Sequence, residues 1–150
     1  ILLRPNTKYF MIDYQKILNQ NMVKVLKEVL ENIKKNGLKN GNHLYITFLT
    51  NHKYVEIPKW LTDSYPKEMT IIIEYEYYNL EINDDFFLIT LSFNNIKADL
   101  KIGFDSIISF ADPSANFGLR FNLDIPNEKN DKSNVENKDN IINFAKFKKN

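Results

Sequence analysis

The side chains best suited to chemistry in this sequence are few and lie far apart. His43 and His52 are its two histidines, and each stands at the end of a stretch typical of a β-strand. A metal centre needs several ligands at fixed spacing, and two isolated histidines do not supply them. The sequence contains no H-E-x-x-H, G-x-S-x-G, P-loop or G-x-G-x-x-G pattern. We therefore predict no metal site and no cofactor.

Acidic and hydroxyl side chains occur together in two turn sequences. Asp84 and Asp85 are adjacent, and neighbouring side chains of an extended chain diverge, so a carboxylate pair that shares a proton is not expected. Asp112 and Ser114 flank a proline, and Asp-Pro-Ser is a turn former with no histidine near it in the sequence. Both patterns favour a structural role, and we expect a protein that is not an enzyme.

A third cluster combines aromatic and acidic residues. Tyr75, Tyr77 and Tyr78 resemble a stacking platform for single-stranded nucleic acid. Glu74 and Glu76 interleave with them and would repel phosphate. The formal net charge is only +1, and arginine, the better fork for phosphate, is scarce. We therefore expect no nucleic acid and favour a place for the tyrosines in a core or in a groove for a protein ligand.

Length and composition predict one globular domain. The 150 residues are 43% hydrophobic and 13% aromatic, which is enough for a sizeable core. There is no cysteine, so disulfide and thiolate chemistry are excluded. No apolar run approaches the roughly 20 residues of a membrane span, and the start has no signal-peptide pattern. We expect a cytoplasmic protein without membrane contact.

The first element that the pattern predicts is a helix over about 14–35. Asp13 is a good N-cap, and Gly37 suits the turn after the last helical residue. Apolar residues recur at spacings of three and four, as on one face of a helix: Leu18, Met22, Val25, Leu26, Val29, Leu30 and Ile33. This stripe is wide, so it can cover a sheet, and it can also supply a dimer contact.

Short β-prone runs separated by turn residues follow the helix. Asn94-Asn95 is typical of a type I′ hairpin, because Asn tolerates positive φ. The segment 59–67, with Trp60, is expected to be a turn-rich loop. The predicted strands are 43–50, 54–57, 69–78, 86–93, 96–102, 108–111 and 117–121. The predicted fold is mainly β with an N-terminal α-helix: a small antiparallel β-sandwich or partly open barrel, followed by a disordered tail.

The composition changes after the last strand. Residues 123–140 are polar and of mixed charge, and such a segment buries too little apolar area to offset its ordering entropy. The last ten residues, 141–150, are apolar and basic. We therefore expect a domain over 13–122, a flexible linker over 123–140 and a docking peptide over 141–150. A terminal helix packed on its own domain is the alternative for the last segment.

Several stretches together resemble the SspB adaptors of the ClpXP protease, in their alphaproteobacterial form. The most specific is SFADPSANFGLRF, residues Ser109–Phe121, and the tail fits the family's ending of apolar residues followed by phenylalanine and basic residues. The other stretches are His43–Phe48, Ile57–Ile73, Tyr77–Phe87 and Leu91–Ile96.

The resemblance implies a function without catalysis. In this family a groove of the sandwich binds degradation tags such as the ssrA peptide, and the C-terminal peptide docks on the N-terminal domain of the ClpX unfoldase. The family is homodimeric, largely through the helix. On this basis we expect tag-binding residues at Val55, Ile57, Tyr75, Glu76, Tyr77, Ser92 and Phe93; ClpX-docking residues at Ile141, Ile142, Phe144, Phe147, Lys148 and Lys149; and dimer contacts at Met22, Leu26 and Val29.

Two other classes were weighed against this interpretation. An Sm-like or OB-like RNA-binding module would fit a small β fold, but the near-neutral charge and the interleaved glutamates argue against it. A small-molecule hydrolase lacks a plausible nucleophile and base in this sequence.

Overall fold

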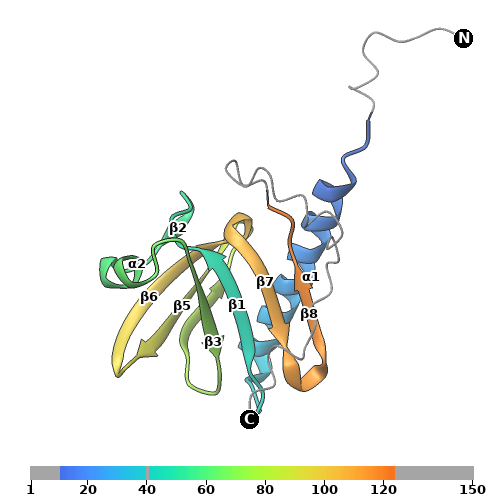
Figure 1. The fold of residues 1–150 in the computed structure, drawn as a ribbon. Coiled ribbons are helices and arrows are strands. Elements are labelled where there is room, and N and C mark those ends of the chain that lie inside the picture. Colours follow the sequence, from blue (N-terminus) through green and yellow to red (C-terminus); the bar gives the residue numbers. More distant parts are fainter. Residues whose placement is uncertain (1–10, 40, 124–150) are drawn as a thin grey trace, which may run out of the picture.

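The chain folds into two antiparallel β-sheets with one long helix beside them (Figure 1). The structure is a computed structural model, and it describes residues 11–39 and 41–123. One sheet has the strand order β3-β1-β7-β8 and the other the order β2-β6-β5-β4. This arrangement confirms the predicted fold class, mainly β with an N-terminal helix. Residues 124–140 of the predicted linker and the whole predicted docking peptide lie outside the described residues.

The elements follow one another in a simple order along the chain. They are α1 (Tyr14–Asn36), β1 (Leu44–Leu49), β2 (Val55–Glu56), α2 (Lys59–Ser64), β3 (Glu68–Ile73), β4 (Tyr78–Ile82), β5 (Phe86–Phe93), β6 (Ile96–Gly103), β7 (Ile107–Asp112) and β8 (Phe117–Arg120), with short 3-10 turns at Phe104–Ser106 and Pro113–Ala115.

Both ends of α1 form as the sequence predicts. The side chain of Asp13 accepts a hydrogen bond from the backbone N–H of Lys16 at 3.1 Å, which makes Asp13 the N-cap. At the other end Gly37 has a φ of +75°, and its N–H donates to the Ile33 carbonyl at 2.7 Å. Glycine adopts such a φ without the steric cost that a side chain would add.

The inner face of α1 covers one side of the two-sheet sandwich. Met22, Leu26, Leu30 and Ile33 are its buried residues, and their spacing places them on one stripe of the helix. Full burial of a side chain of this kind contributes about 1.5–3 kcal/mol. This face therefore belongs to the domain's own core.

Hydrogen bonds fix α1 to both sheets. Near its start, the Asn19 side-chain amide donates to the Asn122 carbonyl just after β8, at 2.8 Å. Near its end, the Tyr77 hydroxyl donates to the Ile33 carbonyl at 3.0 Å, next to β4. Because β8 and β4 belong to different sheets, the helix holds the two sheets together on this side.

The predicted hairpin joins β5 to β6. Asn94 and Asn95 have φ values of 54° and 68°, as a type I′ turn requires, and Phe93 pairs with Ile96. Alternate residues of the strands point into the space between the sheets. The largest fully buried side chains there include Phe48, Phe87 and Phe110 together with Ile46, Ile71 and Ile89.

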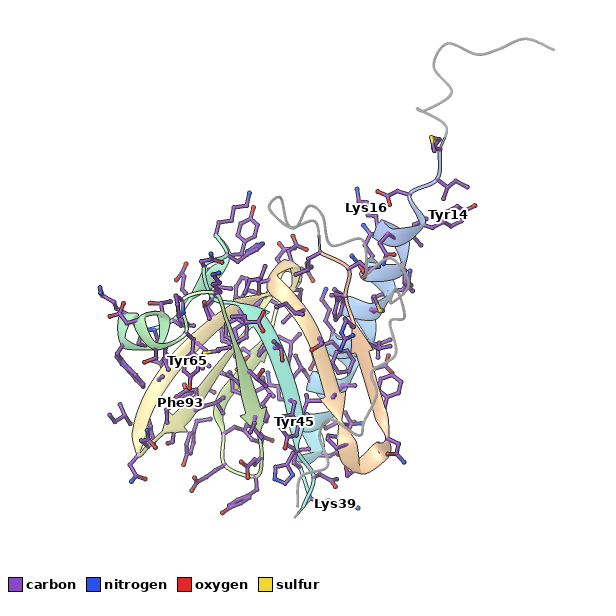
Figure 2. The ribbon with its side chains drawn as sticks, in the orientation of Figure 1. Tyr14, Lys16, Lys39, Tyr45, Tyr65 and Phe93 are labelled. Carbon is purple, nitrogen blue, oxygen red and sulfur yellow. The ribbon has the colours of Figure 1, made fainter. Side chains whose placement is uncertain are left out.

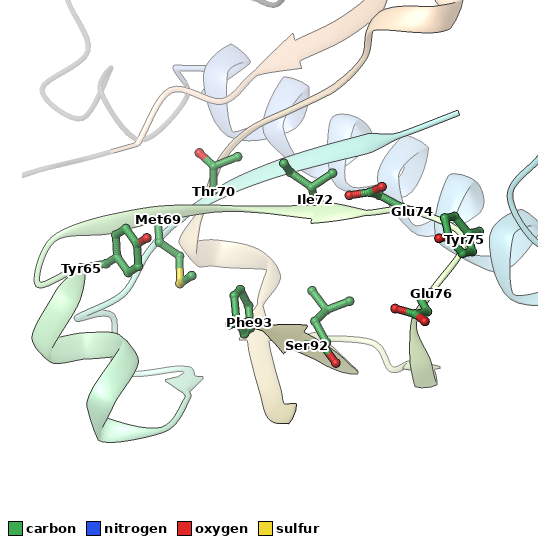
Figure 3. Close-up of a pocket in the computed structure, with 10 residues that line it drawn as sticks. Tyr65, Met69, Thr70, Ile72, Glu74, Tyr75, Glu76, Ser92 and Phe93 are labelled. Atoms are coloured by element: carbon green, nitrogen blue, oxygen red, sulfur yellow. The ribbon is translucent and has the colours of Figure 1, made fainter. Parts of the chain in front are cut away.

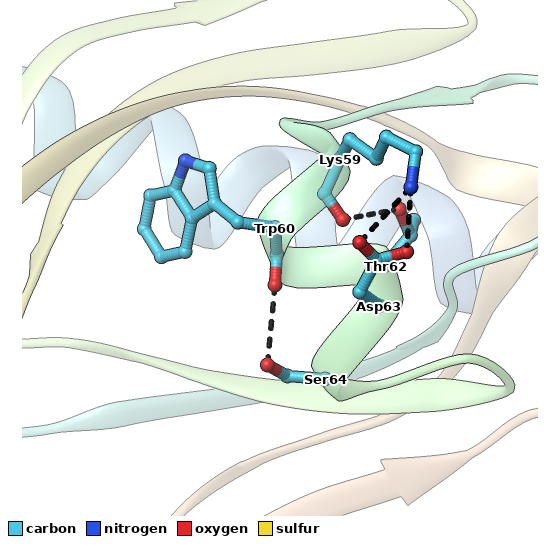
Figure 4. Close-up of polar contacts among 5 residues, drawn as sticks. All are labelled: Lys59, Trp60, Thr62, Asp63 and Ser64. Atoms are coloured by element: carbon cyan, nitrogen blue, oxygen red, sulfur yellow. Dashed lines mark hydrogen bonds and ion pairs between the residues drawn. The ribbon is translucent and has the colours of Figure 1, made fainter.

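One predicted loop is a helix. The expectation of a turn-rich loop over 59–67 is wrong, because α2 occupies Lys59–Ser64. Pro58, with φ −58°, precedes the helix, and Leu61 anchors it with an exposure of 2%. Hydroxyl groups of the helix also bond to its own carbonyls: Thr62 to Lys59 at 2.9 Å and Ser64 to Trp60 at 3.1 Å (Figure 4).

One predicted strand is two. The expectation of a single strand over 69–78 is wrong, because β3 ends at Ile73 and β4 begins at Tyr78. Residues 74–77 carry the chain from one sheet to the other, since β3 pairs with β1 and β4 pairs with β5. None of the helices in the described part of the chain has the length and apolar character that crossing a membrane requires.

Candidate functional site, a groove between the two sheets

A groove of about 330 Å³ opens on the side of the sandwich where β3 faces β5 (Figure 3). This size lies within the usual range of ligand sites. Two segments separated in the sequence form it: the stretch 65–76, which includes β3 and part of the connection to β4, and the end of β5 over 91–93. Its lining residues are Tyr65, Met69, Thr70, Ile72, Glu74, Tyr75, Glu76, Leu91, Ser92 and Phe93.

The groove follows a strand edge that has no neighbouring strand among the described residues. β3 is the last strand of its sheet, with β1 on its other side. Met69 points into the core, whereas Thr70 and Ile72 lie on the outer face, yet all three line the groove. A groove lined from both faces of one strand runs along the strand's edge. Backbone N–H and C=O groups at such an edge can pair with an added extended chain.

An aromatic wall closes one end of the groove. Phe93 packs against Trp60 of α2, with ring centroids 6.2 Å apart and an interplanar angle of 77°. Such an edge-to-face pair contributes about 0.5–1.5 kcal/mol beyond its buried area. Tyr65 lies beside them under α2 (Figure 2), and its carbonyl accepts a hydrogen bond from the Thr50 hydroxyl of the chain after β1. The wall is therefore held in place by both α2 and β1.

The other end of the groove is acidic. Glu74 lies 3.4 Å from the imidazole Nε2 of His43. Glu76 is exposed, and within the described part of the chain it has neither an ion pair nor a side-chain hydrogen bond. Among the described residues no lysine, arginine or histidine lines the groove. The groove thus combines an apolar floor with uncompensated negative charge.

The side chains that line the groove offer contacts for binding. Ser92 is its one serine, and no histidine lies with it in the lining. A serine nucleophile needs a base within hydrogen-bond reach. Within residues 11–39 and 41–123 there is also no group of three or more His, Cys, Asp or Glu residues placed to hold a metal ion. What this arrangement can do is accept an extended chain against β3 and hold its apolar side chains.

The structure brings together four of the residues predicted to bind a peptide tag. Tyr75, Glu76, Ser92 and Phe93 all line the groove. Whether they bind a tag stays a prediction.

The other three lie elsewhere. Val55 is in β2, at the far edge of the second sheet, where it pairs with Ile102, and Ile57 follows that strand. Tyr77 turns toward α1 and bonds to the Ile33 carbonyl. Val55, Ile57 and Tyr77 therefore do not line this groove, and their part in tag binding stays a prediction.

Sequence reasoning missed more than half of the groove. The predicted binding residues did not include Tyr65, Met69, Thr70, Ile72, Glu74 or Leu91. Nothing in a single strand pattern shows which strand ends up at a sheet edge. A usable signal was the segment between Trp60 and Pro66, which contains large aromatic side chains close to a proline and directly precedes the edge strand.

The three residues predicted to form dimer contacts differ in their burial. Met22 and Leu26 are 4% and 0% exposed within one protomer, so they pack on their own sheets, and a dimer contact through them stays a prediction. Val29 is half-buried at the edge of this face. The exposed apolar side chains of the helix are Tyr14, Ile17, Leu18 and Val25. The predicted docking residues, Ile141 to Lys149, lie outside the described residues.

The comparison with known families decides the wider assignment. The family described as SspB, Stringent starvation protein B, matches residues 16–147, which is most of the chain. The chain belongs to the SspB family. SspB proteins form a family of ClpXP protease adaptors and not of enzymes, so a protein-binding groove is the kind of site expected. The match also extends past the described residues and includes Ile141, Ile142 and Phe144. No curated protein matches the chain.

Proposed function

We propose that this chain is a proteolysis adaptor that binds ssrA-type degradation tags in the groove between β3 and β5. A C-terminal peptide over 141–150 then docks the adaptor on the N-terminal domain of ClpX. The observation that carries the proposal is the free edge of β3, which lies over an apolar floor in a member of an adaptor family. Tagged substrates would thereby reach the protease without any chemistry on the adaptor.

The groove supports an extended peptide as its ligand. An added strand on β3 gains backbone hydrogen bonds that do not depend on sequence, and its alternate side chains turn toward Ile72, Met69 and Phe93. The acidic lining disfavours RNA, whose phosphates would meet carboxylates and no cation. A peptide site therefore agrees with both the geometry and the charge.

The sequence beyond the domain supports a tether. A polar chain of about 18 residues that behaves as a flexible coil spans on the order of 23 Å r.m.s.. At such a length the local concentration of a tethered partner reaches the millimolar range, and avidity rises by about 10²–10⁴. The apolar and basic residues of 141–150 suit an apolar receptor groove with an acidic rim.

A homodimer would present two tags and two tails together. Tyr14, Leu18 and Val25 form an exposed apolar stripe on α1, about a quarter of a turn around the helix from the stripe that faces the sheets. Such a stripe is a ready contact for the same stripe of a second copy. We therefore propose that the dimer contact lies on this exposed stripe and not on the buried residues of the helix.

Peptide binding is tested by a titration with a labelled tag. A fluorescein-labelled ssrA-type tag peptide is titrated with the full chain, and its fluorescence anisotropy is followed. Ile72→Asp places a charge on the floor of the groove at a side chain that is already 41% exposed. We expect tag affinity to fall by about ten-fold or more, because the peptide's apolar side chains would meet a solvated carboxylate.

Ile96→Asp is the matched control. Ile96 is also an exposed isoleucine, in the β5–β6 hairpin outside the groove. This variant should bind the tag as the wild type does. Equal affinity of Ile72→Asp and wild type would place the tag site somewhere else on the molecule.

A further inference from the structure

We infer that Glu76 sets the charge preference of the groove, so that the preferred tags carry a basic side chain, and no carboxylate, at the position that lies against the β3–β4 connection. This inference rests on the proposed function and refines it. It assigns a specificity-determining residue and the chemical class of the peptide: extended, apolar over β3, and cationic at one end.

The Glu76 carboxylate is available to a ligand. Three other glutamates of the sheets and their connections have ion-pair partners: Glu74 has His43 at 3.4 Å, Glu81 has Lys34 at 2.8 Å and Glu56 has Lys101 at 3.6 Å. Within the described residues Glu76 has none. An incoming cation therefore does not have to displace an existing partner.

Glu76 is also placed where a bound peptide would pass. It stands in the short crossing between the sheets, at the mouth of the groove, and Figure 3 shows its carboxylate next to the space between β3 and Ser92. A peptide that continues past Ile72 along the β3 edge must pass this carboxylate. The peptide's side chain at that point meets Glu76 and, behind it, the Glu74 carboxylate.

No cation of the described residues neutralises this end of the groove. Lys97 faces Ser92 across the β5–β6 hairpin, but its ammonium lies over the Tyr78 ring, 4.2 Å from the ring centre, and Lys97 does not line the groove. The imidazole of His43 lies beside the Glu74 carboxylate. An acidic tag residue would thus meet two carboxylates at short range, whereas a lysine or arginine would meet two acceptors.

The expected change in tag affinity follows from the usual strength of exposed ion pairs. One such pair changes affinity by up to about five-fold, and replacing the cation by an anion adds a repulsion of similar size. We therefore expect the ratio between a lysine and a glutamate at this tag position to be roughly ten-fold at low salt. Salt at about 1 M shortens the Debye length to about 3 Å and should bring the ratio close to one.

The test is a charge scan of the tag against the full chain. Each position of a fluorescein-labelled ssrA-type tag is made Lys, Gln or Glu in turn, and affinities are measured by anisotropy. At one or two adjacent positions we expect the order Lys, Gln, Glu from tightest to weakest. Glu76→Lys should reverse the order at the same positions, and Glu76→Gln should flatten it. Glu31→Lys on the exposed face of α1 makes the same change in net charge and should leave the order unchanged.

The outcomes separate this inference from the function on which it rests. If the tags bind but show no charge preference, or if Glu76→Lys leaves the preference as it was, the role of Glu76 is overturned while tag binding stands. If no tag binds the wild-type chain at all, the proposed function itself fails, and the inference fails with it.

Discussion

The two long sides of the sandwich differ in what covers them. On one side α1 packs against the sheets with Leu26 and Leu30, both with 0% exposure. Hydrogen bonds at Asn19 and at Ile33 also connect the helix to each sheet. On the other side β3 ends its sheet without a further strand among the described residues, and Ile72 stays 41% exposed.

The covered side contributes mainly to stability, whereas the open side has the features of a binding surface. The covered side buries its apolar surface and satisfies its polar groups within one protomer. The open side has a strand edge, an apolar floor and, among the described residues, a carboxylate without an ion pair. A strand edge of this kind can take up an extended chain, and this is the basis of the proposed binding function.

The largest expected effect tests the contrast directly. Leu30→Ala should lower the free energy of unfolding by about 2–5 kcal/mol, because it leaves a cavity under α1. Ile72→Ala on the open side should cost less than about 1 kcal/mol, since its side chain is already partly in water. Urea unfolding of the two full-length variants measures both values. Equal losses would mean that the helix side is not the protein's main source of stability.

The second prediction concerns the outer face of the helix. The double variant Leu18→Asp with Val25→Asp changes two exposed apolar side chains and leaves the buried stripe intact. We expect a folded monomer in light scattering after gel filtration, whereas the wild type is expected to be a dimer. Ile96→Asp, which adds one charge outside the helix, should remain dimeric. A folded dimer from the double variant would place the interface on another surface.

The smallest expected effect concerns the ion pair that links the helix to β4. The hydrogen bond from Lys34 to Glu81, at 2.8 Å, raises the pKa of Lys34 above its ordinary value. A raised pKa means that this contribution to stability is present below the ordinary pKa of lysine and is lost as the pH rises through the higher folded-state value. Both side chains are exposed to solvent, so the contribution is small.

The test compares wild type and Lys34→Met over a pH series. Their difference in stability should stay constant between about pH 7 and pH 9, begin to fall near the lysine pKa of about 10.4 in unfolded chains, and disappear above the higher folded-state pKa. High salt should also reduce it. A difference that grows with pH would show that another group is responsible.

Local chemistry determined most of what the sequence could predict of the fold. Asp13 and Gly37 mark the ends of α1 because capping acts between neighbouring residues, and Asn94-Asn95 specifies its hairpin for the same reason. The break after Ile73 could not be predicted in this way. The run from Met69 to Tyr78 is uniformly β-prone, and the chain leaves the sheet there because β4 has its partner in the other sheet.

The candidate site was predictable only in part, for a related reason. Tyr75, Glu76, Ser92 and Phe93 were singled out as binding residues, and the fold places all four in the groove. Ile72 and Tyr65 gain their importance only because β3 is an edge strand and α2 ends beside it. Strand order is set by packing over the whole chain, and no short sequence pattern predicts it. The same holds for the burial of Met22 and Leu26, which one stripe of apolar residues does not reveal.

The most direct test of the central claim is the delivery of a tagged substrate. Degradation of an ssrA-tagged reporter by ClpXP is measured at sub-saturating substrate with the full chain, with a chain that ends at Asn140, and with Ile72→Asp. We predict that the full chain lowers the apparent KM by about ten-fold or more, whereas the shortened chain and Ile72→Asp leave KM unchanged. If the full chain and the shortened chain lower KM equally, delivery does not depend on the C-terminal peptide, and the adaptor mechanism proposed for this chain is wrong.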